Sequence, residues 1–263
     1  MNTLTIGNMT LGEGMPKICI PLTGRTPEAL VEQAKETKQQ PCQMVKWRAD
    51  YILAEMKSLS LSEVCKKLKD LLQQLREVLE VPILFTIRTA SEGGKISVSS
   101  NAYYYINQII AETGMVDVID IEVFDAPGMV QEEKLRAFVE FAKEKGCKIL
   151  LSNHDFFATP DMEEMMTRYF VMQELGADIM KLAVMPQEEG DVINLLEVAT
   201  LMRDKYARVP FIAISMGELG MTTRVCGGEF GSVITFASGK DASAPGQMDA
   251  FMLQGLLEQY YGA

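Results

Sequence analysis

Eight short, β-rich apolar runs recur along the chain, separated by stretches that mostly have helical patterning. Apolar runs without polar alternation are typical of parallel strands, which are buried on both faces. The predicted strands are 18–22, 44–50, 83–89, 118–124, 148–155, 179–185, 211–216 and 232–237. The predicted helices include 27–38, 62–79, 131–145, 161–175, 191–206 and 247–260.

Regular alternation of strand and helix predicts an α/β protein with a parallel sheet. Eight strands in 263 residues favour a (β/α)8 TIM barrel over an open doubly wound sheet. The chain has no glycine-rich dinucleotide fingerprint and no Walker sequence, which weakens the open-sheet alternative. Since no repeat or linker divides the chain, we predict a single barrel domain over residues 1–263.

Charge and cysteine usage narrow the function classes. The net charge of −11 and the absence of a basic run argue against nucleic acid as a partner, so a small molecule is expected instead. The chain has no apolar stretch of about 18 residues and no secretory leader pattern, so we expect a cytoplasmic protein that does not span a membrane. Five cysteines without C-x-x-C spacing are typical of reduced thiols, and no metal site is expected.

Two ionisable residues interrupt neighbouring apolar runs. His154, the only histidine, lies in the run 149–155, and Lys181 lies in the run 178–186. A lone histidine in such a run is more often a core residue, and a lone lysine usually extends to the surface. However, the apolar flanks of Lys181 suggest burial, which lowers the pKa of an amine. Together the two residues predict a Schiff-base site with a base that titrates near neutrality.

Other polar residues lie at the predicted carboxyl ends of the strands, where barrel enzymes place their chemistry. They are Arg48, Asp50, Arg88, Glu92, Asp120 and Glu122, with Arg224 beyond the seventh strand and the segment 243–247 after the last. The cations predict an anionic substrate, because the arginine fork matches a carboxylate. For Arg48 and Arg88, a structural ion pair at the barrel rim is an equal alternative.

Several motifs in fixed order resemble one enzyme family, the type I 3-dehydroquinate dehydratases. The resemblance extends from Pro16 almost to the C-terminus. It rests on W-R-A-D (47–50), F-T-I-R (85–88) with E-G-G (92–94), I-D-I-E (119–122), S-N-H-D (152–155), K-L-A-V-M-P (181–186) and S-A-P-G-Q (243–247). The last five motifs together are highly specific.

The resemblance implies a β-elimination that needs neither metal nor cofactor, within the shikimate pathway. Lys181 would form a Schiff base with the ketone of 3-dehydroquinate, and His154 would act as general acid and base to give 3-dehydroshikimate. Glu92 matches the carboxylate that orients this histidine, while Asp120 is a weaker candidate for a second partner. The family is often dimeric, so a homodimer is expected.

The same resemblance implies a set of residues that bind the substrate, a cyclic hydroxy keto-acid. Arg224 and Gln247 would hold its carboxylate, with Ser243 and the backbone of Ala244 closing over it. The remaining implied contacts are Arg48 and Arg88 to the ring hydroxyls and Met216 and Phe236 as an apolar wall.

Lys46 departs from the family pattern, which typically has a glutamate before W-R-x-D, and Ile214 replaces a common methionine. Lys46 substitutes three donors for an acceptor of substrate hydroxyls. It is expected to leave Arg48 and Arg88 without a nearby counter-ion, and to lower the pKa of Lys181. Weaker hydroxyl recognition, an imine-dependent dehydratase or lyase for a related cyclic keto-carboxylate, an engineered substitution and a paralogue without efficient catalysis all remain open. A non-catalytic protein that binds a cyclic hydroxy acid is the alternative from another class.

Overall fold

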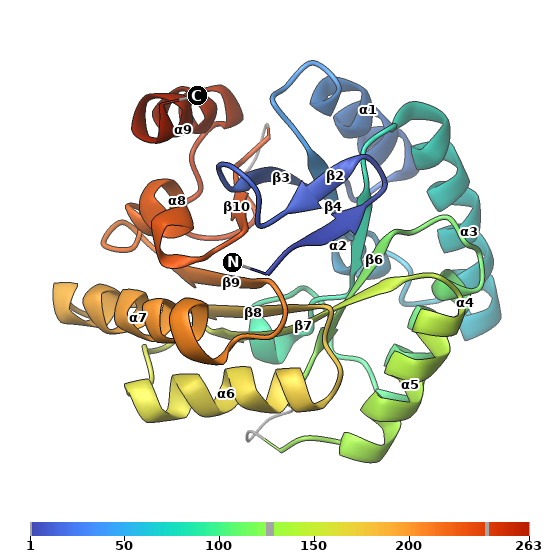
Figure 1. Ribbon diagram of the computed structural model, residues 1–263. Coiled ribbons are helices and arrows are strands. Elements are labelled where there is room, and N and C mark those ends of the chain that lie inside the picture. Colours follow the sequence, from blue (N-terminus) through green and yellow to red (C-terminus); the bar gives the residue numbers. More distant parts are fainter. Residues whose placement is uncertain (1, 125–128, 240–241, 263) are drawn as a thin grey trace.

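Eight parallel strands form the wall of a barrel in the computed structural model, which describes residues 2–124, 129–239 and 242–262 (Figure 1). The first seven strands pair with one another in the order of the chain, as in a (β/α)8 barrel. The strands are β3 (Lys17–Leu22), β4 (Met44–Arg48), β5 (Ile83–Thr86), β6 (Val118–Glu122), β7 (Lys148–Asp155), β8 (Ile179–Val184), β9 (Phe211–Ser215) and β10 (Ile234–Phe236).

The barrel closes between its first and last strands. β10 pairs in parallel with β3, and its other side meets β9 through a bridge between Phe211 and Ser232. The backbone N–H of Val233 donates to the Phe211 carbonyl at 3.0 Å. The predicted (β/α)8 TIM barrel is therefore confirmed.

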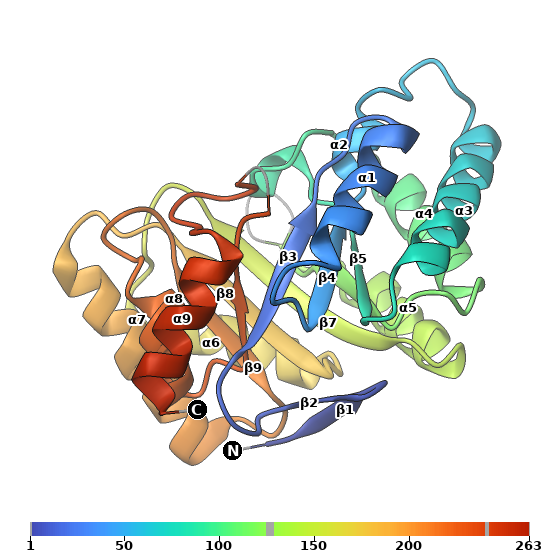
Figure 2. The same ribbon diagram turned by 90° about the horizontal axis from the view of Figure 1, so that it is seen from above.

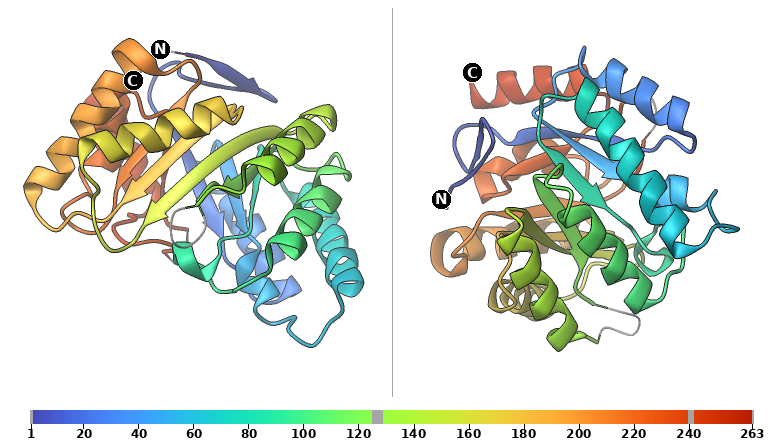
Figure 3. Two further views of the ribbon diagram at one scale, coloured as in Figure 1. Left: turned by 90° about the horizontal axis from the view of Figure 1, so that it is seen from below. Right: turned by 90° about the vertical axis from the view of Figure 1, so that its right-hand side faces the viewer.

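Helices surround the strands and cover their outer faces, as two further directions of view show (Figure 3). The long helices are α1 (Pro27–Thr37), α3 (Leu61–Val78), α4 (Ser100–Ala111), α5 (Glu132–Glu144), α6 (Met162–Glu174), α7 (Glu189–Leu201) and α9 (Ala250–Tyr261). Shorter turns are α2 (Asp50–Leu53), α8 (Thr223–Cys226), η1 (Ala90–Glu92), η2 (Met202–Tyr206) and η3 (Gly227–Phe230). Among the described residues, no helix is both long and apolar enough to cross a membrane.

Strand alternation divides the core into an outer and an inner layer. In β5, Ile83 and Phe85 pack with the helices, whereas Leu84 belongs to the cluster inside the barrel. The outer layer explains why the strands have no polar alternation, since it buries the face that would otherwise meet water.

An N-terminal hairpin, β1 (Leu4–Ile6) with β2 (Met9–Leu11), was absent from the predicted elements. Its apolar side chains Ile6, Met9 and Leu11 join the inner core cluster. Figure 2 shows the hairpin at the end of the barrel where β3 begins. It therefore plugs the end opposite the carboxyl ends of the strands.

The predicted helices also omitted α4, whose sequence contains three consecutive tyrosines and several β-branched residues. Such residues have only moderate helix propensity. The Ser99 side chain caps the helix by accepting from the Ala102 N–H at 3.3 Å, and Tyr103, Ile106 and Ile110 are buried. Tertiary burial, more than local preference, stabilises this helix.

Candidate active site

The alternation of the strands directs four ionisable side chains into the barrel. Lys46 lies between two residues of the outer core, and so does Lys181. Asp120 has the same placement in β6, and His154 has the parity of Leu150, an inner-core residue of β7. Because successive side chains of a strand point to opposite faces, these four side chains from β4, β6, β7 and β8 all face the inside of the barrel.

One cavity is lined by the twelve residues expected to act in catalysis or substrate binding, whereas Asp120, the weaker candidate, is not part of its lining. Its lining includes Lys46, Arg48, Arg88, Glu92, His154, Lys181, Met216, Arg224, Phe236, Ser243, Ala244 and Gln247. Phe156, Ala183 and Ile214 complete it. These residues come from strands β4, β7, β8, β9 and β10 and from segments that follow strands, so the cavity lies at the carboxyl ends of the strands.

Lys181 is 5% exposed and forms no hydrogen bond or ion pair with the residues that the structure describes. Its Nζ lies 4.1 Å from the centroid of the Phe236 ring. Burial lowers the pKa of Lys181 well below its ordinary value, and the positive charge of Lys46 lowers it further. Such an amine is neutral, and therefore nucleophilic, at a lower pH than an ordinary lysine.

His154 is held by a carboxylate in the same cavity. Its Nδ1 lies 2.9 Å from Glu92 Oε2, and its backbone N–H donates to the same oxygen at 3.1 Å. A proton on Nδ1 leaves Nε2 free as a base. Burial, followed by the charges of Arg88 and Lys181, lowers the pKa of His154 well below its usual value, so the imidazole is neutral near pH 7.

Arg88 is surrounded by three carboxylates. Its Nη1 donates to Glu92 and Glu122 at 2.9 Å each, and its Nη2 donates to Asp120 at 2.6 Å. The expectation that Lys46 leaves this arginine without a counter-ion is therefore wrong. Because Nη1 also donates to Ser152 Oγ at 3.1 Å, the geometry suits Arg88 for organising the carboxylates.

Arg48 likewise has a counter-ion of its own. Its Nε and Nη2 donate to the two oxygens of Asp50 at 2.7 and 2.8 Å. Asp50 begins the short helix α2, which is why β4 ends at Arg48 and not at residue 50 as predicted. Arg48 Nη1 approaches the Ser243 carbonyl at 3.5 Å, so this side of the guanidinium faces the segment after the last strand.

Asp120 bonds to cations and hydroxyls. It accepts from Lys46 Nζ at 2.9 Å and from Ser152 Oγ at 2.6 Å, besides Arg88. Burial acts to raise its pKa, but the charges of Arg88, Lys46 and Lys181 outweigh that effect and hold the pKa well below the usual range. His154 has its carboxylate contact with Glu92, and no contact supports Asp120 as a second partner among the described residues.

Arg224 differs from the other two arginines because no carboxylate contacts it among the described residues. It donates to the carbonyls of Phe236 at 3.2 Å and Pro245 at 2.7 Å, while its buried Nε has no partner in the described part of the chain. Burial lowers the pKa of Arg224 to about 10, so it is charged at neutral pH. This arginine is available for an anion.

Gln247 shapes the segment above Arg224. Its Oε1 accepts from the Ser243 backbone N–H at 2.7 Å, and its Nε2 lies 3.3 Å from Ser243 Oγ. Gly246 has a φ of +74°, and a Cβ there would lie 2.3 Å from the Gly217 carbonyl oxygen. Glycine therefore permits the turn that brings the side chains of Ser243 and Gln247 together.

Two residues behind Glu92 were not predicted. Asn153 Nδ2 donates to Glu92 Oε1 at 3.0 Å, and Asn153 Oδ1 accepts from Arg168 Nη1 at 2.7 Å. Asn153 follows Ser152 and precedes His154 in β7, and strand alternation alone would place it on the other face from His154, so the sequence held no clear signal for its contact with Glu92. Arg168 lies on α6, so only the packing of that helix reveals it.

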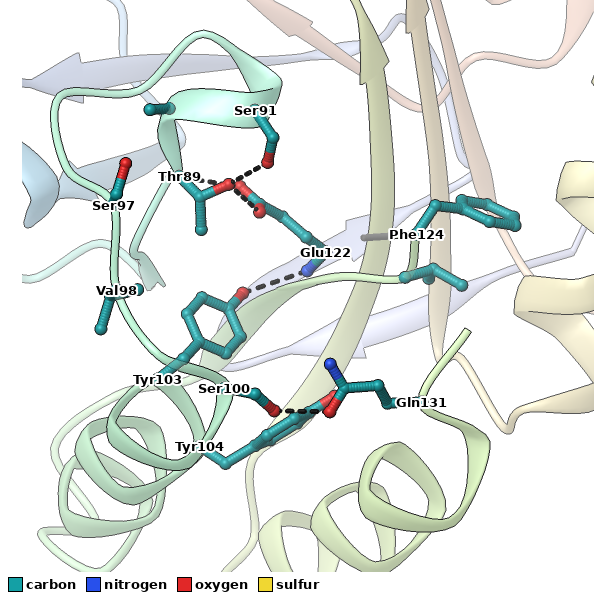
Figure 4. A pocket seen from close by; sticks show the side chains of 12 residues that line it. Thr89, Ser91, Ser97, Val98, Ser100, Tyr103, Tyr104, Glu122, Phe124 and Gln131 are labelled. Carbon is teal, nitrogen blue, oxygen red and sulfur yellow. Dashed lines mark hydrogen bonds between the residues drawn. The ribbon is translucent and has the colours of Figure 1, made fainter. Parts of the chain in front are cut away.

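A second cavity, of about 230 Å³, lies behind Glu122 (Figure 4). Figure 4 shows Thr89 bonded to Glu122, whose backbone N–H donates to the Tyr103 hydroxyl at 3.1 Å. This cavity is larger than the one around Lys181 but contains neither lysine nor histidine. We therefore assign the candidate active site to the smaller cavity around Lys181, because that cavity brings a lysine, a histidine and a carboxylate together.

A buried amine with a lowered pKa, a histidine held by a carboxylate and an arginine free for an anion share the catalytic end of a barrel. This combination defines a barrel enzyme that acts on a small anionic molecule.

Comparisons with known proteins agree with that class. The family model described as type I 3-dehydroquinase matches residues 18–263. A 3-dehydroquinate dehydratase of Clostridium novyi (strain NT) is 43% identical over 98% of this chain and 97% of its own length. One of Clostridioides difficile (strain 630) is 41% identical over 96% of this chain and 94% of its own.

Solved structures show the same relationship. A type I 3-dehydroquinate dehydratase from Clostridium difficile superposes with a TM-score of 0.91 at 39% identity, covering 100% of this chain and 99% of the other. The enzyme from Geobacillus kaustophilus HTA426 has a TM-score of 0.90 at 31% identity, with complete coverage of both chains. The chain belongs to the type I 3-dehydroquinase family.

Proposed function

We propose that this enzyme converts 3-dehydroquinate to 3-dehydroshikimate through a Schiff base on Lys181, with His154 as general acid and base. The observation that carries the proposal is the pairing of a buried, unpartnered Lys181 with a carboxylate-held His154 in one cavity of a family member. The solved Clostridium difficile relative carries covalently modified comenic acid, which is consistent with covalent chemistry in this family.

The first step is attack of neutral Lys181 Nζ on the ketone carbon of the substrate. Loss of water gives an iminium, which draws electrons from the neighbouring carbon and acidifies its protons. The lowered pKa of Lys181, caused first by burial, supplies the neutral amine. The positive charge that then forms is close to the ionised carboxylate of Asp120.

His154 Nε2 then removes the carbon-2 proton and forms an enamine. The imidazolium that results is stabilised by Glu92, which lies 2.9 Å from Nδ1. The same proton passes to the carbon-1 hydroxyl as it leaves as water, and hydrolysis of the conjugated imine releases 3-dehydroshikimate and regenerates Lys181. A residue of this kind typically contributes a rate factor of about 10² to 10⁴.

Arg224 would hold the substrate carboxylate, since its buried Nε is free and no carboxylate contacts it among the described residues. Gln247, Ser243 and the backbone of Ala244 would close over the same group. Met216 and Phe236 supply the apolar wall. Arg48 would contribute Nη1 to the ring hydroxyls, and Arg88 would mainly organise the carboxylates.

The resemblance that suggested this reaction also supports a place in the shikimate pathway. On the same ground we propose a homodimer and a cytoplasmic location. Size-exclusion chromatography with light scattering tests the oligomeric state.

Borohydride trapping tests the imine. Incubation with 3-dehydroquinate followed by borohydride should add the mass of a reduced adduct to the peptide that contains Lys181. Lys181→Ala should abolish the adduct, whereas Lys143→Ala, at a lysine on the outer helix α5, should not. An adduct located on Lys46 would overturn the assignment, and turnover of 3-dehydroquinate without any adduct would overturn the mechanism.

A further inference from the structure

Two buried lysines share this cavity, and one contact distinguishes them. Lys46 and Lys181 are each 5% exposed. Lys46 Nζ donates to Asp120 Oδ2 at 2.9 Å, whereas Lys181 has no carboxylate partner among the described residues. Burial disfavours both ammonium groups, but a carboxylate in direct contact favours the charged form of the lysine that it touches. The retained positive charge therefore belongs to Lys46.

Asp120 is well suited to keep that charge in place. It is 1% exposed and also accepts from Arg88 Nη2 and Ser152 Oγ, at 2.6 Å each. With Thr86 Oγ1 at 3.2 Å, two charged donors and two hydroxyl donors favour its ionised form. An ionised Asp120 is the counter-ion that Lys46 requires in a buried position.

The ring of Phe236 lies against both amines. Lys181 Nζ is 4.1 Å from the ring centroid, and Lys46 Nζ is 5.6 Å from it. Like charges repel strongly in such a poorly hydrated space, so a charged Lys46 disfavours protonation of Lys181. The ring itself attracts a cation, which is a weaker opposing effect.

Charged and titratable groups reach the neighbourhood of Lys181 from five other strands or their ends. They are Cys19 of β3, Lys46 of β4, Arg88 beyond β5, Asp120 of β6 and His154 of β7. The neighbouring strand β9 (211–215) and the closing strand β10 (234–236) contain no ionisable residue. Lys46 is the largest cause after burial of the lowered pKa of Lys181.

We propose that Lys46 is a positioning residue whose positive charge keeps Lys181 in its neutral, nucleophilic form. This inference rests on the proposed imine chemistry, because only the neutral amine attacks a carbonyl. Lys46 thereby acts through Lys181. A lysine at this position gives the chain an electrostatic means of activating its nucleophile that a carboxylate there would not provide.

The test measures the charge of Lys181 without the substrate. Reductive methylation with formaldehyde and cyanoborohydride, followed by mass spectrometry of the Lys181 peptide, reports the neutral amine at each pH. Lys46→Met should raise the apparent pKa of Lys181 by about one unit or more. The change removes a repelling cation and leaves the negative charge of Asp120 less neutralised. Lys46→Arg, which retains the charge, should restore the low value.

Lys143→Met is the matched control, because it makes the same change in formal charge at an exposed lysine whose partner, the half-buried Asp178, lies 3.4 Å away. It should leave the apparent pKa of Lys181 unchanged. An equal shift in this control, or no shift in Lys46→Met, would overturn the proposal. Should Lys46→Met fail to fold, Lys46→Gln retains a donor for Asp120 and must show the same upward shift.

Trapping with 3-dehydroquinate separates this inference from the proposed function. A Lys181 adduct combined with unchanged labelling in the Lys46 variants overturns only the role of Lys46. A labelling shift without any adduct overturns only the imine mechanism. If both proposals hold, the pH below which the trapping rate falls must be higher in Lys46→Met than in the parent. In Lys46→Arg it must be the same as in the parent.

Discussion

Replacement of Glu92 by alanine tests the link between the carboxylate network and proton transfer. Glu92 is 3% exposed and holds His154 through two contacts at 2.9 and 3.1 Å. A hydrogen bond to a charged group contributes about 1.5 to 3 kcal/mol, and a neutral backbone bond about 1 kcal/mol. Loss of both contacts should therefore raise the barrier by about 2.5 to 4 kcal/mol, which corresponds to a fall in kcat of about 10² to 10³.

The assay is the ultraviolet absorbance of the conjugated product, which the substrate lacks. We expect kcat to fall while KM for 3-dehydroquinate changes by no more than a few fold, because Glu92 acts through His154. Glu92→Gln preserves the size of the side chain and one acceptor, so its loss should be intermediate.

Stability must be measured in parallel, since Arg88 loses one of its three carboxylates. Asp120 and Glu122 still contact this arginine, so the free energy of unfolding in urea should fall by only about 1 to 3 kcal/mol. If the folded alanine variant retains kcat within about fivefold of the parent, well inside the range expected for a general base, Glu92 only supports the fold and the reasoning fails.

Three further predictions concern the proton, the metal and the acid limit of stability. His154→Ala should retain the borohydride adduct on Lys181 while turnover falls by about 10² to 10⁴, and turnover within a few fold of the parent would make His154 structural. Activity should be unaffected by EDTA because the iminium supplies the electron withdrawal, and a loss restored by a divalent ion would refute the mechanism. The lowered pKa of Asp120 means that its ionised form stabilises the fold above an unfolded pKa of about 3.9, and that this contribution is lost as the pH falls below that value. The stability advantage of the parent over Asp120→Asn in urea should therefore shrink between about pH 5 and pH 3, and a constant difference would contradict the assigned charge.

The alternation of apolar runs by itself determined the barrel, because a strand buried on both faces and a helix with one buried face have different periods. Strand β7 was predicted at its observed bounds, Lys148–Asp155. The hairpin β1–β2 was missed because its stabilisation comes from Ile6, Met9 and Leu11 in the inner core. Each of its two strands has only three residues, which is too short for the sequence alone to show a recognisable strand pattern.

The sequence by itself also singled out twelve site residues, and all twelve line one cavity, whereas their roles in catalysis and binding stay predictions. Only the tertiary structure decided which charges pair. Sequence comparison suggested that Lys46 isolates Arg48 and Arg88, yet Asp50 lies against one and three carboxylates surround the other. Lys46 itself contacts Asp120, 74 positions away. Pairing depends on strand register and on distances of a few ångströms, which residue spacing along the chain does not contain.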